Sequence, residues 1–210
     1  MNEQRVIFPC GDISLEGVLG LPEGSGPSPA VVICHPHPQY GGSMNNNVVY
    51  AACAALSGES IAWLRFNFRG VGRSDGSFAD GVGEQDDVKA ALTYLGTIPE
   101  IDVNRLGLCG YSFGTMVSIP VADRDDRVQA LAAVSPFFVA KGLLQNYNKP
   151  KLFICGDGDG FIDTQTIRKI VGGLPEPKRC EIIPSADHFW GGFEGELEKH
   201  LAIFFADALK

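Results

Sequence analysis

The chain has 210 residues, 45% of them hydrophobic, and a formal net charge of −8. This is enough for one α/β domain with a sizeable core, which we assign to residues 1–210. The acidic charge argues against a nucleic-acid or membrane partner, because either would need a basic surface. No stretch approaches the roughly 18 apolar residues of a membrane span, and residues 1–6 lack the apolar core of a signal peptide. We therefore expect a soluble, cytoplasmic protein.

Strand-like and helix-like segments alternate along most of the chain. Residues 6–8 and 15–19 flank a turn and predict an antiparallel N-terminal hairpin, which a Gly/Pro/Ser stretch at 22–29 separates from an apolar strand at 30–34. Further strands are expected at 61–68, 105–109, 128–134, 151–155 and 180–183, and helices at 45–57, 84–95, 113–121, 164–171 and 193–209. This order predicts a mostly parallel sheet with helices on both faces and a ligand site beyond the carboxyl ends of its strands.

A serine lies between two glycines where the strand at 105–109 gives way to the helix at 113–121. The residues Gly110-Tyr111-Ser112-Phe113-Gly114 fit the G-x-S-x-G pattern, in which a serine nucleophile sits on a tight strand-to-helix turn. Taken alone, the same five residues also fit a plain strand-to-helix loop. With suitable partners, the motif predicts acyl-transfer chemistry.

A serine nucleophile needs a base, and the base needs a group that orients it. His188 follows the last predicted strand, at the same sheet edge as Ser112, whereas His200 is expected on the solvated face of the last helix. The loop after the strand at 151–155 holds three carboxylates, Asp157, Asp159 and Asp163, and one of them should orient His188. The competing interpretation is that this Asp/Gly-rich loop only makes turns, or forms a loose cation site. A calcium-binding loop would need regular ligand spacing with a terminal Glu, and none follows Asp163.

Other chemistry-bearing residues have structural interpretations. His35 and His37 are close in sequence but have no cysteine or carboxylate at ligand spacing, so we expect no metal and no cofactor, and a structural role for both rings. The six cysteines (Cys10, Cys34, Cys53, Cys109, Cys155 and Cys180) read as small buried hydrophobic residues rather than disulfides. Arg69 and Arg73 are expected to pair with nearby carboxylates at residues 75–87.

Taken together, these segments resemble the α/β-hydrolase superfamily over almost the whole chain. The resemblance rests on Arg69-Gly70-Val71-Gly72-Arg73-Ser74, the serine motif, Gly156-x-x-Asp159 and Ala186-Asp187-His188-Phe189. It implies the α/β-hydrolase fold, with Asp159 as the acid and His188 as the base. Within the superfamily, residues 35–47 and 66–72 resemble small bacterial hydrolases labelled dienelactone hydrolase or X-Pro dipeptidyl peptidase. Dienelactone hydrolases carry a cysteine where this chain has Ser112.

An oxyanion hole requires two backbone N–H groups. One is expected from Phe113, the residue after the nucleophile. The resemblance assigns the second to the loop after the strand at 30–34, where it implies His37, with Gln39 and Tyr40 as reserves. Pro36 and Pro38, which have no N–H, flank His37 and should stiffen this loop.

Residues 136–150 are too few for a cap domain, so we expect an open cleft. Its walls would be aromatic, with Tyr40, Tyr111, Phe161 and Phe189 as substrate-binding candidates and Phe113, Phe137, Phe138 and Trp190 as further ones. The expected reaction is cleavage of a small carboxylic ester, or of a thioester or lactone, through an acyl-enzyme on Ser112. The alternatives are a peptidase acting on small X-Pro substrates and a non-catalytic binding protein. The natural substrate and the oligomeric state cannot be read from the sequence.

Overall fold

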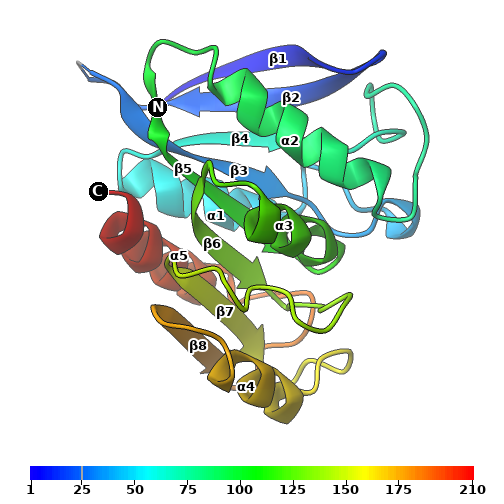
Figure 1. The fold of residues 1–210 in the computed structure, drawn as a ribbon, viewed down its shortest axis with the longest axis vertical. Coiled ribbons are helices and arrows are strands. Elements are labelled where there is room, and N and C mark those ends of the chain that lie inside the picture. The colour runs from blue at the N-terminus through cyan, green and yellow to red at the C-terminus, as the bar shows by residue number, and fades with distance from the viewer. Residues whose placement is uncertain (25) are drawn as a thin grey trace.

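The structure, a computed structural model, describes residues 1–24 and 26–210. It contains one eight-stranded sheet in the order β1-β2-β4-β3-β5-β6-β7-β8 (Figure 1). The strands are β1 (Asn2–Cys10), β2 (Ile13–Leu21), β3 (Ser28–Cys34), β4 (Ala62–Phe66), β5 (Ile101–Tyr111), β6 (Val128–Val134), β7 (Lys151–Gly156) and β8 (Lys178–Ile183). β1, β2 and β4 pair antiparallel, and all later pairs are parallel. The predicted α/β-hydrolase architecture is confirmed.

Helices cover both faces of the sheet, as predicted. They are α1 (Asn47–Gly58), α2 (Gly83–Leu95), α3 (Phe113–Arg124), α4 (Thr164–Gly172) and α5 (Glu194–Leu209). One apolar core lies between the sheet and α2, α3 and α4, and a second lies between the sheet and α1 and α5. Figure 1 shows α2, α3 and α4 in front of the strands and α1 and α5 behind them. The strands between the two cores are therefore buried on both faces, which explains their continuous apolar runs.

Several element boundaries differ from the predicted ones for identifiable reasons. α1 begins at Asn47 rather than at residue 45, because the Asn46 side chain caps the helix by accepting from the Val48 amide at 2.9 Å. β4 ends at Phe66, and the Phe68 amide donates instead to the His35 ring. The hairpin is longer than expected, with nine residues in each strand around a tight turn in which Gly11 has φ 57°.

Residues 135–150, between β6 and β7, form neither helix nor strand. This segment lies at the carboxyl end of β6, where a cap would be inserted. Its Phe137 amide donates to Thr115 Oγ1 at 2.8 Å, which ties it to the start of α3. The expected absence of a cap domain from this segment agrees with the structure.

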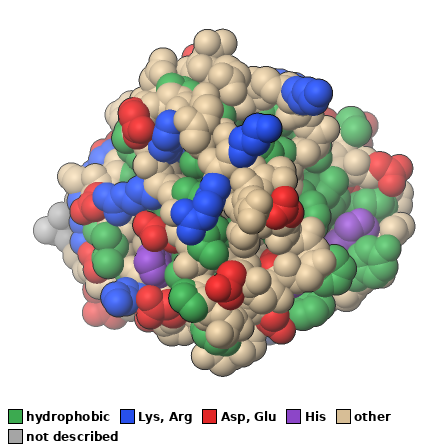
Figure 2. All heavy atoms as spheres, turned by 90° about the horizontal axis from the view of Figure 1, so that it is seen from below, with side chains coloured by type: hydrophobic (Ala, Val, Ile, Leu, Met, Phe, Trp, Pro, Cys, Tyr) green, Lys and Arg blue, Asp and Glu red, His purple; other side chains and the backbone are tan. Residues whose placement is uncertain are grey.

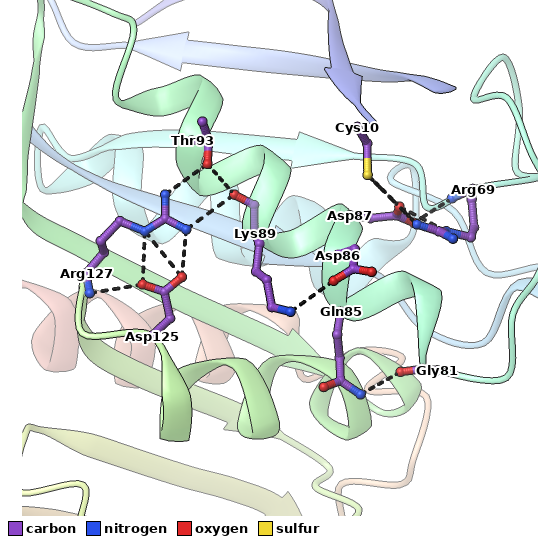
Figure 3. A network of polar contacts seen from close by, with 10 residues as sticks. All are labelled: Cys10, Arg69, Gly81, Gln85, Asp86, Asp87, Lys89, Thr93, Asp125 and Arg127. Carbon is purple, nitrogen blue, oxygen red and sulfur yellow. Dashed lines mark hydrogen bonds and ion pairs between the residues drawn. The ribbon is translucent and has the colours of Figure 1, made fainter. Parts of the chain in front are cut away.

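Polar contacts fasten α2 to the hairpin and to neighbouring loops (Figure 3). Asp87 on α2 is fully buried and accepts from the Arg69 guanidinium at 2.7 Å and from Cys10 Sγ at 3.4 Å. The expectation of internal pairing is thus confirmed for Arg69. It is wrong for Arg73, whose side chain makes no ion pair with any described residue and is exposed.

Charged side chains of both signs are interspersed over most of the face in Figure 2, while hydrophobic ones gather beside a histidine at its right-hand edge. None of the helices in the described part of the chain is long and apolar enough to cross a membrane.

Candidate active site

Ser112 lies on a strained turn between β5 and α3, with φ 53° and ψ −118°. Positive φ is unfavourable for a residue with a Cβ, so the surrounding packing must hold this conformation. The flanking glycines permit that packing. A Cβ at Gly114 would collide with the Cys34 carbonyl at the end of β3, and one at Gly110 would collide with the Ser118 hydroxyl on α3. Only glycine at both positions lets the turn lie against the neighbouring strand and helix.

The structure brings Ser112, His188 and Asp159 together from three separate loops. Ser112 Oγ lies 3.0 Å from His188 Nε2, and His188 Nδ1 lies 2.8 Å from Asp159 Oδ2. All three residues are at most 9% exposed. If Nδ1 carries the ring proton and donates it to Asp159, Nε2 is free to accept the hydroxyl proton of Ser112. The spacing is that of a nucleophile, a base and an orienting acid.

The three carboxylates of the loop after β7 have separate roles in the structure. Asp159 Oδ1 accepts from the amides of Phe161 and Ile162, which leaves Oδ2 for His188. Asp157 accepts from the Ser185 amide at 2.6 Å, and Asp163 caps α4. Asp159 is therefore the carboxylate in contact with His188.

Asp159 remains ionised at neutral pH. Burial acts to raise its pKa, but the hydrogen bond with His188 and the Phe161 amide outweigh that effect and hold the pKa below its ordinary value. A permanent negative charge beside Nδ1 would stabilise an imidazolium if His188 accepted a proton from Ser112.

The loop that carries His188 is anchored on both sides. The Tyr111 hydroxyl donates to the His188 carbonyl at 2.7 Å, and Trp190 Nε1 donates to Ser135 Oγ at 3.1 Å. Burial raises the pKa of Tyr111, so its phenol keeps the proton that it donates. Tyr111 lines the cleft, as expected for a substrate-binding candidate, but its hydroxyl is already engaged in holding His188.

Two backbone amides next to Ser112 have no acceptor. The Phe113 amide begins α3, and among the described residues neither it nor the His37 amide makes a hydrogen bond. The reserve candidates are occupied, because the Gln39 amide donates to the His37 ring at 3.2 Å and the Tyr40 amide to the His37 carbonyl at 3.1 Å. The loop thus leaves the His37 amide available for an oxyanion.

The His35 and His37 rings shape the loop between β3 and α1. His35 is fully buried, with Nε2 accepting from the Phe68 amide and Nδ1 lying 2.6 Å from the Pro36 carbonyl. Burial lowers the pKa of His35 to about 4, which keeps it neutral. The His37 ring packs against Tyr40, Phe78 and Phe113. Elsewhere, His200 lies on α5, 3.3 Å from Glu196 and far from Ser112 in the fold.

Ser112 opens into a cleft of about 630 Å³, which we call the Ser112 cleft. Its lining includes all four predicted substrate-binding residues, Tyr40, Tyr111, Phe161 and Phe189, together with Phe113 and Phe137. Tyr40, Phe161 and Phe189 stand at its rim and are 86%, 65% and 61% exposed.

Two aromatic candidates were wrong, because Phe138 stacks on Phe153 and Trp190 is fully buried. Met116 and Asn46 also line the cleft and were not predicted. The helical repeat could have predicted Met116, because residues four apart lie on the same face of a helix and Met116 follows Ser112 by four residues.

All six cysteines are free. Cys34, Cys53, Cys109 and Cys155 are buried, whereas Cys10 and Cys180 are only partly so. In the residues that the structure describes, no group of three or more His, Cys, Asp or Glu side chains could hold a metal ion.

Comparisons with known proteins find close similarity in sequence and in fold. The family model described as "Dienelactone hydrolase family" matches residues 80–188. An uncharacterized protein of Rickettsia prowazekii is 33% identical over 177 residues, covering 78% of this chain and 72% of that protein. Among solved structures, an α/β serine hydrolase homologue from Coxiella burnetii is 33% identical with a TM-score of 0.86, covering 97% of each chain. An α/β serine hydrolase without a lid from Xanthomonas campestris is 30% identical with a TM-score of 0.85, covering 100% of this chain and 96% of that one.

Proposed function

The chain belongs to the dienelactone hydrolase family and is a hydrolase, and on that basis we propose that it cleaves small, uncharged carboxylic esters through an acyl-enzyme on Ser112. The observation that carries this proposal is the unbroken contact from Ser112 Oγ to His188 Nε2, at 3.0 Å, and from His188 Nδ1 to Asp159 Oδ2, at 2.8 Å.

In the proposed acylation step, Ser112 Oγ attacks the ester carbonyl carbon while its proton passes to His188 Nε2. Asp159 holds the ring through Nδ1 and offsets the positive charge that forms on it. The carbonyl oxygen becomes an anion that accepts from the amides of Phe113 and His37, each worth about 3 kcal/mol of transition-state stabilisation. The carbon–oxygen bond to the alcohol then breaks, and the alkoxide takes the proton from Nε2.

Deacylation repeats these steps with water as the nucleophile. His188 Nε2 removes a proton from water, hydroxide attacks the acyl carbon, and Ser112 Oγ leaves and recovers its proton. The products are a carboxylic acid and an alcohol, and the enzyme returns to its starting state. No redox partner or metal enters this cycle.

The lining of the Ser112 cleft supports an uncharged substrate. Apart from Ser112 and His188, its lining residues are aromatic or apolar side chains, glycines, His37 and Asn46. No Lys or Arg stands among these described residues, so the cleft offers no side-chain cation to a substrate carboxylate. Thioesters and lactones react by the same steps and are the next candidates, followed by small X-Pro amides. The six free cysteines support a reducing compartment such as the cytoplasm.

A fluorophosphonate probe tests the nucleophile directly, because it labels an activated serine. We expect the full-length protein to be labelled at neutral pH and Ser112→Ala to remain unlabelled, with kcat/KM for a p-nitrophenyl ester lower by about 10⁴-fold or more. Equal labelling of both proteins would refute the proposed nucleophile. Absence of labelling and turnover in the wild type would favour a binding protein.

Substrate class is tested by rates on esters of graded acyl length beside thioesters, lactones and X-Pro amides. Matched esters with and without a carboxylate on the acyl group test the role of charge. We expect the uncharged member of each pair to react about tenfold faster or more. A preference for the carboxylate-bearing member would contradict the assignment to uncharged esters.

A further inference from the structure

A second hollow, of about 730 Å³, lies beside the N-terminal hairpin. Its lining comes from β1, β2, β4 with the nearby Asn67, residues 43–45 and residues 71–73, and it shares no described lining residue with the Ser112 cleft. We call it the Arg65 hollow, after the buried arginine in its wall. It lies outside the constellation that the proposed hydrolysis uses.

The pairing of the strands places two arginines in one row across the sheet. Arg5 on β1 pairs with Val18 on β2, and Val18 pairs with Arg65 on β4. Val18 belongs to the core that α1 and α5 cover, so the row faces that side of the sheet. α1 packs on β3, β4 and β5, while α2 lies on the opposite face of β1 (Figure 1). The face of the hairpin beside α1 is thus left to form the floor of the hollow.

Arg65 is only 8% exposed, and its guanidinium is partly without partners. Nη1 donates to the Met44 carbonyl at 3.1 Å and to Asn45 Oδ1 at 2.7 Å, and the group lies 4.7 Å from the Tyr50 ring centre. Nε is buried with no hydrogen-bond partner, and Nη2 makes no hydrogen bond with any described residue. No described carboxylate lies within ion-pair distance of Arg65. An arginine stays charged, and a buried charge without a counter-ion is costly.

The remaining charges in the hollow favour an anion. Arg5 and Arg73 also line it, against two carboxylates, Glu3 and Glu16. The Glu16 carboxylate is already held by Asn67 Nδ2 at 2.7 Å and by the Arg73 amide at 2.6 Å. A concentration of arginines around one hollow is notable in a chain whose net charge is −8.

We propose that the Arg65 hollow binds a small organic anion, whose carboxylate or phosphate accepts from Nη2 of Arg65, the guanidinium nitrogen that is not buried and makes no hydrogen bond with a described residue. The N–H groups on Nη2 make charge-assisted hydrogen bonds with the oxygens of either anion. Arg5 and Arg73 add positive charge at the mouth, and Val18, Met44 and Val71 offer apolar contact to the body of the ligand. This proposal does not depend on the chemistry of Ser112.

Amide chemical shifts test the proposal and separate the two cavities. Gly17 and Gly72 line the Arg65 hollow, whereas Gly41 and Gly42 line the Ser112 cleft. The full chain is titrated with phenyl phosphate, with benzoate and with uncharged benzamide. We expect saturable shifts at Gly17 and Gly72 with at least one anion at about 10 mM or below, and none with benzamide. The tighter anion distinguishes a phosphate ligand from a carboxylate ligand.

Variants test the role of the arginine. Arg65→Gln should weaken anion binding by about tenfold or more, whereas Arg124→Gln, which removes an exposed arginine elsewhere, should leave it unchanged. If Arg65→Gln fails to fold, the double variant Arg5→Gln/Arg73→Gln, made at two exposed positions, should weaken binding about threefold or more.

Three results would each overturn the proposal. The first is the absence of shifts at Gly17 and Gly72 with both anions, and the second is equal shifts with benzamide. The third is unchanged anion affinity in the Arg65→Gln protein or, if that variant does not fold, in the double variant. Shifts confined to Gly41 and Gly42 would assign the anion to the Ser112 cleft instead, and would also overturn it.

Discussion

The Ser112 cleft and the Arg65 hollow are both lined by parts of one stretch of chain, residues 36–46. They differ in whether their polar side chains have partners. In the cleft, Ser112, His188 and Asp159 are all hydrogen-bonded, and the Phe113 and His37 amides have no acceptor among the described residues. In the hollow, a permanent charge on Arg65 has no counter-ion among the described residues. An oxyanion that forms only during a reaction is stabilised by neutral hydrogen-bond donors that are already in position. A ligand that is charged before it binds is instead attracted by a side chain of the opposite charge.

The largest effect inside the cleft, after loss of the proposed nucleophile, is expected from Asp159, the proposed orienting acid. Asp159→Asn should lower kcat about 10³- to 10⁴-fold, because His188 loses the charge that fixes its tautomer. The matched change Asp157→Asn, in the same loop, should cost about fivefold or less, since the Asp157 side chain hydrogen-bonds to the Ser185 amide and to no other described residue. Steady-state kinetics on one ester measure both. A greater loss at Asp157 would reverse the assignment of the acid.

The amide proposed as the second oxyanion donor can be removed without disturbing the backbone. His37 has φ −56°, which proline adopts readily, so His37→Pro removes the amide hydrogen, while His37→Ala removes only the ring. We expect kcat for the proline variant to be about 10²-fold below that of the alanine variant. Similar rates in the two variants would show that the donor lies elsewhere in the loop.

His35, the residue that precedes the stretch of chain at 36–46, should make the stability of the protein sensitive to acid. Its pKa is about 4 when folded, below the ordinary 6.5, so between these values the unfolded chain binds a proton that the folded protein does not. Folding stability should therefore fall as pH drops from 6.5 to 4, by about 3 kcal/mol from this residue, and change no further from it outside that window.

Urea unfolding of wild type and His35→Gln at several pH values measures this contribution. The glutamine variant should be less stable at pH 7, because it loses the fitted ring, but should show a shallower decline between pH 6.5 and 4. Parallel declines in the two proteins would mean that His35 does not carry the acid sensitivity.

The smallest effect is expected from the phenol that holds His188. Tyr111→Phe removes the donor to the buried His188 carbonyl, and we expect kcat to fall about fivefold, corresponding to about 1 kcal/mol. Tyr147→Phe is the matched control, because this buried tyrosine donates to the Val128 carbonyl at the other end of the sheet. An equal loss of kcat in both would indicate a general effect on folding rather than on His188.

The sequence predicts the fold, and it predicts which candidate site residues lie together, because both depend on the order of elements along the chain. Alternating segments determine a parallel sheet, and loops at the carboxyl ends of its strands must meet, which brings Ser112 and His188 to one edge. The choice among Asp157, Asp159 and Asp163 needed the resemblance to a family, because three carboxylates in one loop satisfy the same spacing.

Other features depend on contacts that a linear pattern does not contain. The availability of the His37 amide follows from which neighbouring amides are already bonded inside the loop. The Arg65 hollow arises from strand register and from five separate segments. Arg73 is near several carboxylates in sequence but makes no ion pair with any described residue, so the prediction from proximity was wrong there.

The backbone at Ser112, with φ 53° and ψ −118°, implies a conflict between folding and turnover. Glycine adopts such angles without the steric cost that a Cβ brings, so Ser112→Gly should yield an inactive protein that is about 1 kcal/mol more stable. The hydroxyl at this position is therefore retained at the expense of thermodynamic stability, and the most robust version of this fold would be one that performs no catalysis.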